Sequence, residues 1–342
     1  MIFFRNDYSE GAHPKILEAL METNMEQTVG YGEDHYCLEA AQMIKDKIEA
    51  PHADVHFLVG GTQTNFTALS SFLRPHEAVI SSSRGHICVH ETGAIEATGH
   101  KIIAMPTLDA KITASQIEEA VSYHCDEHMV KPKVVYITNS TELGTLYSKA
   151  ELEEISATCK KHNLYFYLDG ARLASALTAP DSDVTMKDLV ELTDAFYIGG
   201  TKNGLLFGEA LVLINDKLKE DFRYIIKQKG GLLAKGRLLG IQFKTLFEDD
   251  LYHQMGKHAN DMAELLRNGI ADLGYEFFSK STTNQIFPVF PNELVLELEK
   301  ICSFEHEGPV DDKQEAIRFV TSWATPKADV LELLEELKKL SC

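Results

Sequence analysis

Short apolar runs alternate with helix-like stretches along most of this chain. Seven runs are rich in Val, Ile, Phe and Tyr and are bounded by Gly, Pro, Asn or Asp: 55–60, 78–82, 101–106, 133–139, 164–170, 195–201 and 210–215. Near-continuous apolarity, as in residues 134–137, is typical of strands that are buried on both faces. The pattern therefore predicts an α/β domain with a central, mostly parallel sheet and helices on both faces.

Two helix starts can be located from polar pairs spaced three residues apart. Ser148 is followed by Glu151, and Thr113 by Gln116. A Ser or Thr answered three residues later by Glu or Gln forms a capping box, in which each side chain accepts from the other residue's backbone N–H. We expect helices to begin at both pairs.

The pattern changes after about residue 245. Residues 251–273 and 328–340 predict helices, whereas 285–289 and 316–323 predict strands. We therefore expect a large domain over residues 1–245 and a smaller α+β domain over 246–342. No linker rich in Pro, Gly or Ser separates them, so we expect close packing.

Composition excludes several classes of function. The chain has 342 residues, and 33 Lys and Arg against 52 Asp and Glu give a net charge of −19. This balance argues against binding nucleic acid or an anionic membrane surface. No apolar run approaches the roughly 20 residues that span a bilayer. The N-terminus shows no secretory pattern, so we expect a cytoplasmic protein.

Cysteine and histidine spacing argues against a metal centre. No C-x-x-C or H-E-x-x-H motif occurs. Scattered single cysteines suit a reducing compartment. We expect no metal, and we expect most of the six cysteines to be buried apolar residues: Cys37, Cys88, Cys125, Cys159, Cys302 and Cys342.

Three predicted strands end in residues that carry chemistry. Gly60, Gly61 and Thr62 join a strand to a helix, whose free N–H groups suit a phosphate, although the same residues form ordinary turns and N-caps. Asp169 ends an apolar strand and needs a partner there, but a turn before Gly170 would also explain it.

Lys202 ends a third strand and is flanked by glycine and apolar residues. Burial would lower its pKa and make it a nucleophile, whereas an exposed loop lysine is the alternative. Since ligands of open α/β sheets bind beyond the carboxyl ends of the strands, the three features are expected to meet. Together they match pyridoxal 5'-phosphate, which needs an anion cradle, an acid at its pyridine nitrogen and a lysine for its aldehyde.

At these residues the sequence resembles the threonine aldolase family, among the fold-type I pyridoxal-phosphate enzymes and close to the β-eliminating lyases. The resemblance covers most of the chain, and Asp169-Gly-Ala-Arg172 is among its most specific parts. The other matching segments are 5–8, 30–34, 61–65, 86–87, 90–94, 201–202 and the region of Arg318.

The resemblance implies roles at the cofactor. Lys202 matches the Schiff-base lysine, and Asp169 the partner of the pyridine nitrogen. Arg172 matches an arginine near cofactor and substrate, and His86 a histidine that stacks on the ring. Gly61, Thr62 and Thr201 are also expected to bind the cofactor.

The resemblance also implies residues that serve the substrate. Arg318 matches the arginine that holds the substrate carboxylate, which suits a guanidinium fork. His128 aligns with a second family histidine near the substrate hydroxyl, and Asn6 is expected at the substrate. A water held by His86 is the alternative base to His128.

The sequence departs from the family at the cofactor. Gly60 replaces a serine of the usual cradle, and 139–141 reads Asn-Ser-Thr in place of Glu-Asn-Thr. Thr201 replaces the usual serine before Lys202. Lys235 replaces an arginine that reaches the cofactor phosphate from a neighbouring subunit.

The implied reaction is cleavage of a β-hydroxy-α-amino acid, typically L-threonine or L-allo-threonine, to glycine and an aldehyde. The alternatives are pyridoxal-dependent β-elimination or amino transfer, or a non-catalytic regulatory protein that binds the cofactor. The resemblance further implies a homodimer or homotetramer with active sites between subunits, where Lys235 or Tyr31 is donated by a second copy.

Overall fold

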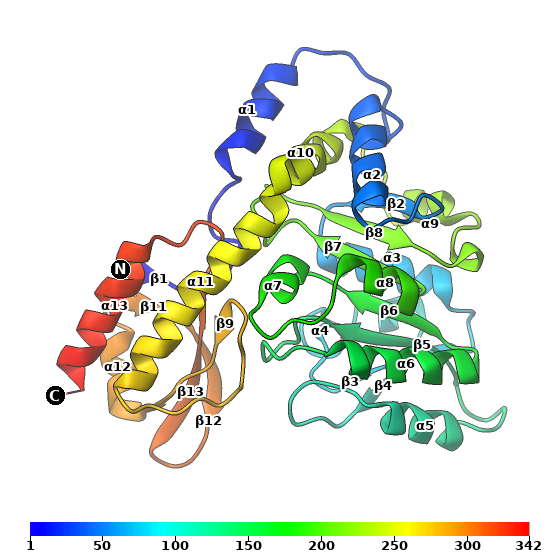
Figure 1. Cartoon of the computed structure of the whole chain (residues 1–342). Helices are drawn as coiled ribbons and strands as arrows, with labels where there is room; N and C mark the ends of the chain where they lie inside the picture. Colours follow the sequence, from blue (N-terminus) through cyan, green and yellow to red (C-terminus); the bar gives the residue numbers. More distant parts are fainter. Residues whose placement is uncertain (342) are drawn as a thin grey trace.

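The computed structural model describes residues 1–341, so Cys342 lies outside the described residues. A seven-stranded sheet forms the centre of its larger part (Figure 1). The strands lie in the order β2-β8-β7-β6-β5-β3-β4. Their bounds are β2 Asp54–Leu58, β3 Glu77–Ser82, β4 Ile102–Met105, β5 Lys131–Thr138, β6 Tyr165–Asp169, β7 Ala195–Gly199 and β8 Glu209–Leu213. All seven predicted strands are thus present.

The sheet is mostly parallel, as predicted. Neighbours from β4 to β7 pair in parallel, and β8 alone runs antiparallel to both β7 and β2. The first residue of β8 therefore lies at the same end of the sheet as the carboxyl ends of the other six strands. That end collects Val59, Asp169, Gly200 and Glu209, which are far apart in sequence.

Alternate strand residues enter two apolar cores, one on each face of the sheet. Phe166 and Leu168 pack on one face, and Tyr136 and Tyr167 on the other. The first core is covered by α2 (His35–Lys47), α5 (Ala114–Tyr123), α6 (Lys149–His162), α7 (Leu173–Thr178), α8 (Met186–Leu192) and α10 (Arg237–Phe247). The second is covered by α3 (Gly61–Phe72), α4 (His86–Val89) and α9 (Phe222–Gln228).

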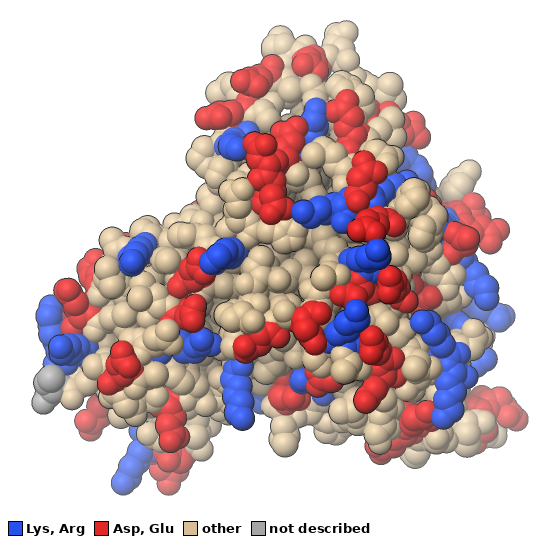
Figure 2. Space-filling view, viewed as in Figure 1, with Lys and Arg blue, Asp and Glu red and all other residues tan. Residues whose placement is uncertain are grey.

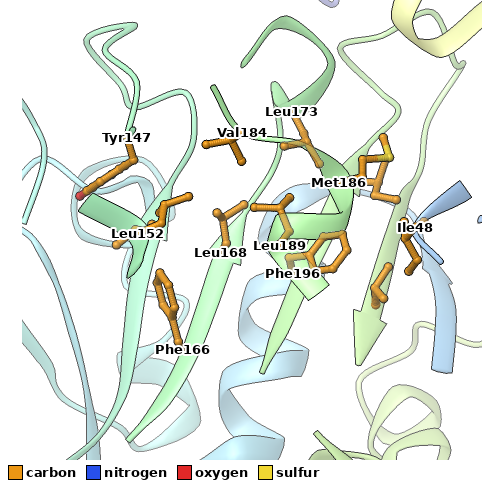
Figure 3. Packing of buried hydrophobic residues seen from close by; sticks show 14 of the residues in the cluster. Ile48, Tyr147, Leu152, Phe166, Leu168, Leu173, Val184, Met186, Leu189 and Phe196 are labelled. Carbon is orange, nitrogen blue, oxygen red and sulfur yellow. The ribbon is translucent and has the colours of Figure 1, made fainter. Parts of the chain in front are cut away.

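Figure 3 shows part of the first core. Phe166 and Phe196 of the sheet lie close to Leu152 and Leu189 of the covering helices. Full burial of one such side chain contributes about 1.5–3 kcal/mol. Burial on both faces explains why the strands read as continuous apolar runs.

Both predicted capping boxes form. The Gln116 N–H donates to Thr113 Oγ1 and the Thr113 N–H to Gln116 Oε1, which starts α5. The reciprocal pair of Ser148 and Glu151 starts α6. Local sequence alone was sufficient to place these starts, since every partner lies within one turn.

The C-terminal part is a smaller unit with its own core. The long α11 (Leu251–Asp272) and α13 (Lys327–Leu340) match the predicted helices and pack against short strands (Figure 1). The remaining elements are β9 (Gln285–Ile286), β10 (Val289–Pro291), α12 (Asn292–Leu298), β11 (Cys302–Ser303), β12 (Glu305–Pro309) and β13 (Gln314–Val320).

Two predictions in this unit need correction. The expected strand 285–289 is divided between β9 and β10, since Pro288 has no N–H to donate to a ladder. The expected strand 316–323 begins and ends earlier, as β13. β12 was not predicted because Glu305–Pro309 is polar and lies exposed at a sheet edge, where no apolar alternation is needed.

The start of the chain packs with its end. β1 (Ile2–Phe3) pairs in parallel with β11, and Ile2 and Phe4 belong to the core of the smaller unit. The sequence placed these residues in the large domain, where the structure does not pack them. α1 (Pro14–Thr23) then leads back to the large unit and packs against α10.

Acidic and basic side chains are interspersed over the face shown in Figure 2. Within residues 1–341, no helix combines the length and the apolar character required to cross a membrane.

Candidate active site

A cavity of about 490 Å³ lies at the edge of the sheet where the strand ends meet. This volume falls in the range of about 300–1,000 Å³ that is usual for small-molecule sites. Its wall comes from the turns after β2, β5, β6 and β7, from α4, and from β9 and β13 of the smaller unit. Both units therefore contribute to it.

One end of the cavity is the N-terminus of α3. Gly60, Gly61 and Thr62 line it, and no side chain caps the helix. The first-turn N–H groups of a helix have no intrahelical partners and carry partial positive charge. A β-carbon on Gly61 would lie 3.1 Å from Tyr197 Oη, a buried hydroxyl without a hydrogen-bond partner within the described chain. Glycine thus leaves room and free donors for an anion.

Asp169 is held at the end of β6 by three hydrogen bonds. Its Oδ2 accepts from Asn65 Nδ2 at 3.0 Å and from Tyr136 Oη, and its Oδ1 accepts from the Ala171 N–H at 3.0 Å. The bond to Ala171 is a turn contact, so the turn interpretation is partly right. The carboxyl also lines the cavity, and the alternative ion pair with Arg172 does not form.

Arg172 instead pairs with Asp7, a partner that the sequence analysis did not identify. Arg172 Nε donates to Asp7 Oδ2 at 2.7 Å and Nη2 to Oδ1 at 3.1 Å. Asn284 Nδ2 of the smaller unit also donates to Asp7 Oδ2, at 2.9 Å. These buried contacts tie the N-terminal segment to both units directly beside the cavity.

Lys202 lies in the cavity wall just after β7, next to Thr201. Burial lowers the pKa of its amine, and the positive charge of Arg172 lowers that pKa further. No hydrogen bond or ion pair with another described residue engages its Nζ. The position is that of a partly buried nucleophile rather than an exposed loop lysine.

Glu209, the first residue of β8, was not identified from the sequence. It is buried in the cavity wall, and the Gly200 N–H donates to its Oε2 at 3.1 Å. Burial raises the pKa of this carboxyl to about 8, and Lys202 acts in the opposite direction. The sequence does not show that β8 runs antiparallel to its neighbours, and only this direction brings its first residue to the carboxyl ends of the other strands.

His86 is oriented by a buried carboxyl. Its Nδ1 lies 2.8 Å from Glu91 Oε1, and Asn65 Nδ2 donates to the same oxygen at 2.7 Å. Since Asn65 also donates to Asp169, one amide links the two acids. A carboxyl at Nδ1 orients the ring and leaves Nε2 available to a ligand.

Arg318 reaches the cavity from β13. Its Nε is buried without a hydrogen-bond partner within the described residues. Burial lowers the pKa of its guanidinium, and the charge of Arg172 adds to that effect. An unpaired buried cation at a cavity wall is suited to bind an anionic group.

The structure does not bring His128 into the site. His128 lies exposed in the turn before β5, where its N–H donates to Asp126 Oδ1. The cavity is at the other end of this eight-residue strand, which at about 3.3 Å per residue spans roughly 25 Å. His128 therefore does not reach the cavity of its own chain, because the histidine precedes the strand instead of following it, and its role as the base stays a prediction.

Asn6 and Lys235 also lie outside the cavity wall of this chain. Asn6 Oδ1 accepts from the Tyr8 N–H and from Ser9 Oγ, which makes it part of a local turn, whereas Tyr8 lines the cavity. The expected role of Asn6 at the substrate stays a prediction. Lys235 is exposed between α9 and α10.

The residues of the cavity fit pyridoxal phosphate. The uncapped α3 N-terminus suits the phosphate, and Tyr197 Oη offers a further unpaired donor beside Gly61. Asp169 presents a carboxyl at the strand end, and Lys202 presents an amine of lowered pKa. Within residues 1–341, no cluster of His, Cys, Asp and Glu has the arrangement needed to hold a metal ion.

Comparisons with known proteins agree with this chemistry. The model of the Beta-eliminating lyase family matches residues 4–292. The low specificity L-threonine aldolase of Pseudomonas sp. (strain NCIMB 10558) is 33% identical over 98% of this chain and 96% of its own. That of Pseudomonas aeruginosa is 32% identical with the same coverage.

Solved structures give the same result. A Leishmania major threonine aldolase is 50% identical, covers 100% of both chains and superposes with a TM-score of 0.99. A Thermus thermophilus aspartate aminotransferase, 13% identical with a TM-score of 0.74 over 99% of this chain and 91% of its own, shares the fold.

Proposed function

The chain belongs to the β-eliminating lyase family and, within it, to the threonine aldolases, and on this basis we propose that it cleaves L-threonine and L-allo-threonine to glycine and acetaldehyde. The observation that carries the proposal is the cavity that places Asp169, Lys202 and Arg318 around an uncapped helix N-terminus. The enzyme is a pyridoxal-phosphate-dependent carbon–carbon lyase.

Pyridoxal phosphate, when bound, supplies an aldehyde that condenses with amines and a ring that accepts the electron pair of a broken Cα bond. We propose that Gly61, Thr62 and Thr201 hold its phosphate end. Asp169, fixed by Asn65 and Tyr136, would hold the protonated pyridine nitrogen.

Lys202 and His86 would serve the reactive centre. The lowered pKa of Lys202 provides a neutral amine, which can attack a carbonyl and later exchange a proton with Cα. His86, oriented through Glu91, would cover one face of the cofactor ring.

Arg318 is the proposed anchor of the substrate carboxylate, since its Nε is unpaired while Arg172 is engaged by Asp7. Holding the carboxylate fixes the rotation about Cα and so selects which of its bonds is broken. Arg172 would contribute positive charge beside the site. Because His128 of the same chain is remote, we propose that a group lining the cavity accepts the β-hydroxyl proton.

A substrate panel tests the proposal. Purified protein loaded with pyridoxal phosphate is incubated with L-threonine, L-allo-threonine and L-serine, and aldehyde, glycine, keto acid and ammonia are measured. Aldehyde with equimolar glycine is expected. Keto acid and ammonia from serine, without aldehyde from any β-hydroxy amino acid, would show β-elimination instead.

We propose a homo-oligomer whose second copy brings Lys235 or Tyr31 to the cavity. Apolar side chains are exposed along residues 17–38, among them Met21, Met25 and Leu38, which is typical of a contact surface. Light scattering coupled to gel filtration would test the oligomer. A monomer with full activity would contradict it.

The division into two units and the compartment also remain proposals. We propose a boundary near residue 245, with residues 2–4 packed against the smaller unit. We propose a cytoplasmic location. Cys37 and Cys159 are free thiols whose pKa is raised by burial, which suits a reducing compartment.

A further inference from the structure

Three acids line the cavity, and they are held in different ways. Asp169 is fixed by Asn65, Tyr136 and Ala171, and Glu209 lies beside Lys202 at the strand edge. Glu142 lies in the turn after β5, and no ion pair within the described residues engages it. Asp169 is the proposed partner of the cofactor and Glu209 feels the charge of Lys202, whereas Glu142 has no role so far.

Each oxygen of Glu142 accepts one hydrogen bond. Oε1 accepts from the His86 backbone N–H at 2.7 Å, and Oε2 accepts from Thr138 Oγ1 at 2.9 Å. A carboxylate oxygen has two lone pairs, so each oxygen keeps a further acceptor site. Both bonds fix the carboxyl in place without neutralising it.

Glu142 also lies on the side of the cavity where the substrate anchor enters. Its neighbour Thr141 accepts a bond at its carbonyl from Gln285 Nε2 of the smaller unit. Arg318 reaches the cavity from the same unit, through β13, which pairs with the strand of Gln285. A substrate held by Arg318 would therefore place its side chain between the smaller unit, His86 and Glu142.

We propose that Glu142 is the catalytic residue that takes the proton of the substrate β-hydroxyl. This inference rests on the proposed aldol cleavage. The O–H bond breaks and its proton goes to Glu142 as the carbonyl C=O forms and the Cα–Cβ bond breaks. The electron pair of that bond stays with the glycine fragment, and a proton delivered to Cα completes glycine.

The protonation behaviour of Glu142 suits this task. Burial raises the pKa of the carboxyl to about 7, and the bond from Thr138 opposes that rise. A base with a pKa near the working pH both accepts and releases protons efficiently. The charged and titratable groups that face Glu142 are His86, Cys88, Tyr136, Tyr147, Asp169 and Arg172.

Four of these neighbours have pKa values well above neutrality. Burial raises the pKa of the Cys88 thiol to about 11 and holds the pKa values of Tyr136 and Tyr147 well above 10. The pKa of Arg172 is raised by Asp7 against the effect of burial. An acidic limb near pH 7 in kcat/KM is therefore expected from Glu142, and a Glu142 variant tests that origin.

The test compares two reactions of the loaded enzyme. Cleavage of L-threonine needs a base for the β-hydroxyl, whereas exchange of the glycine α-proton with solvent deuterium needs only the cofactor and the groups around Cα. For Glu142→Gln we expect kcat of cleavage to fall by about 10²–10⁴-fold. Glycine exchange, read by NMR, is expected to stay within about threefold, and the acidic limb near pH 7 to disappear.

A matched control is Glu77→Gln, a buried glutamate at the opposite edge of the sheet, which should leave both reactions unchanged. A second variant, Thr138→Val, removes the donor to Oε2. It should move the acidic limb to higher pH by about 0.4–1 unit, from about 0.5–1.5 kcal/mol per hydrogen bond.

The outcomes separate the inference from the proposed function. Cleavage by Glu142→Gln within threefold of wild type, equal loss of both reactions, or an unmoved limb in Thr138→Val would each overturn the role of Glu142 alone. A wild-type enzyme that exchanges glycine but releases no aldehyde from any β-hydroxy amino acid would overturn the proposed function, and this inference with it.

Discussion

Replacement of Asp7 by asparagine should destabilise the protein strongly while changing few atoms. Asp7 is 1% exposed and Arg172 14%, and two hydrogen bonds of 2.7 and 3.1 Å join them. Removing one partner of a buried ion pair costs about 3–5 kcal/mol, since the other charge stays buried without compensation. Without Asp7, the unpaired charge of Arg172 would also lie near Lys202 and Arg318, whose pKa values it already lowers.

The pH dependence of this loss has a definite sign. Burial alone would raise the pKa of the Asp7 carboxyl, but the charges of Arg172 and Lys202 and the hydrogen bonds hold that pKa below its ordinary value. A lowered folded-state pKa contributes stability above the unfolded value, about 3.9, and this contribution is lost as pH falls through the folded value. The difference between wild type and variant should therefore be constant near neutrality and shrink below about pH 4.

Urea unfolding measures both effects. At pH 7 we expect Asp7→Asn to lower the free energy of unfolding by about 3–5 kcal/mol, and the double variant with Arg172→Met to regain part of it. The control Glu49→Gln breaks an exposed pair with Lys187 and should cost less than about 1 kcal/mol. A loss below 1 kcal/mol in Asp7→Asn, or one that is the same at pH 3 and pH 7, would refute this reasoning.

Three further predictions test the site and the fold. Lys202→Ala should lower kcat of threonine cleavage by about 10²–10⁴-fold. It should also abolish borohydride-dependent attachment of the cofactor, which intact-protein mass spectrometry measures. Attachment that persists would show that another residue bonds to the cofactor. His128→Ala should keep threonine cleavage within twofold of wild type, because His128 is exposed at the far end of β5. A large loss of activity in a steady-state assay would show that His128 acts in the site after all. Gly170→Ala should destabilise by about 1–3 kcal/mol or more, because its β-carbon would lie 2.0 Å from the Tyr197 carbonyl oxygen. Gly11→Ala, with open space, is the control, and equal thermal midpoints for both variants would show that the contact relaxes freely.

Reactive side chains could be predicted from the sequence where they directly follow a buried strand. Asp169 and Lys202 follow buried apolar runs, and the parallel sheet brings such ends to one edge. The positions of Glu209 and Glu142 could not be predicted in the same way. Glu209 begins an antiparallel strand, and Glu142 lies four residues past the end of β5, in a turn that the sequence does not orient.

The seven strands, the two capping boxes and the long helices follow from local sequence, since period and capping depend on residues within one or two turns of each other. Which distant residues meet depends instead on how the segments pack. The packing paired Arg172 with Asp7 rather than with Asp169, placed β1 in the smaller unit and left His128 at the amino end of β5, away from the cavity of its own chain. The reason is physical: these outcomes depend on which buried charge finds a partner and on which edge of the sheet a residue reaches, and both are set by packing between segments far apart in the chain.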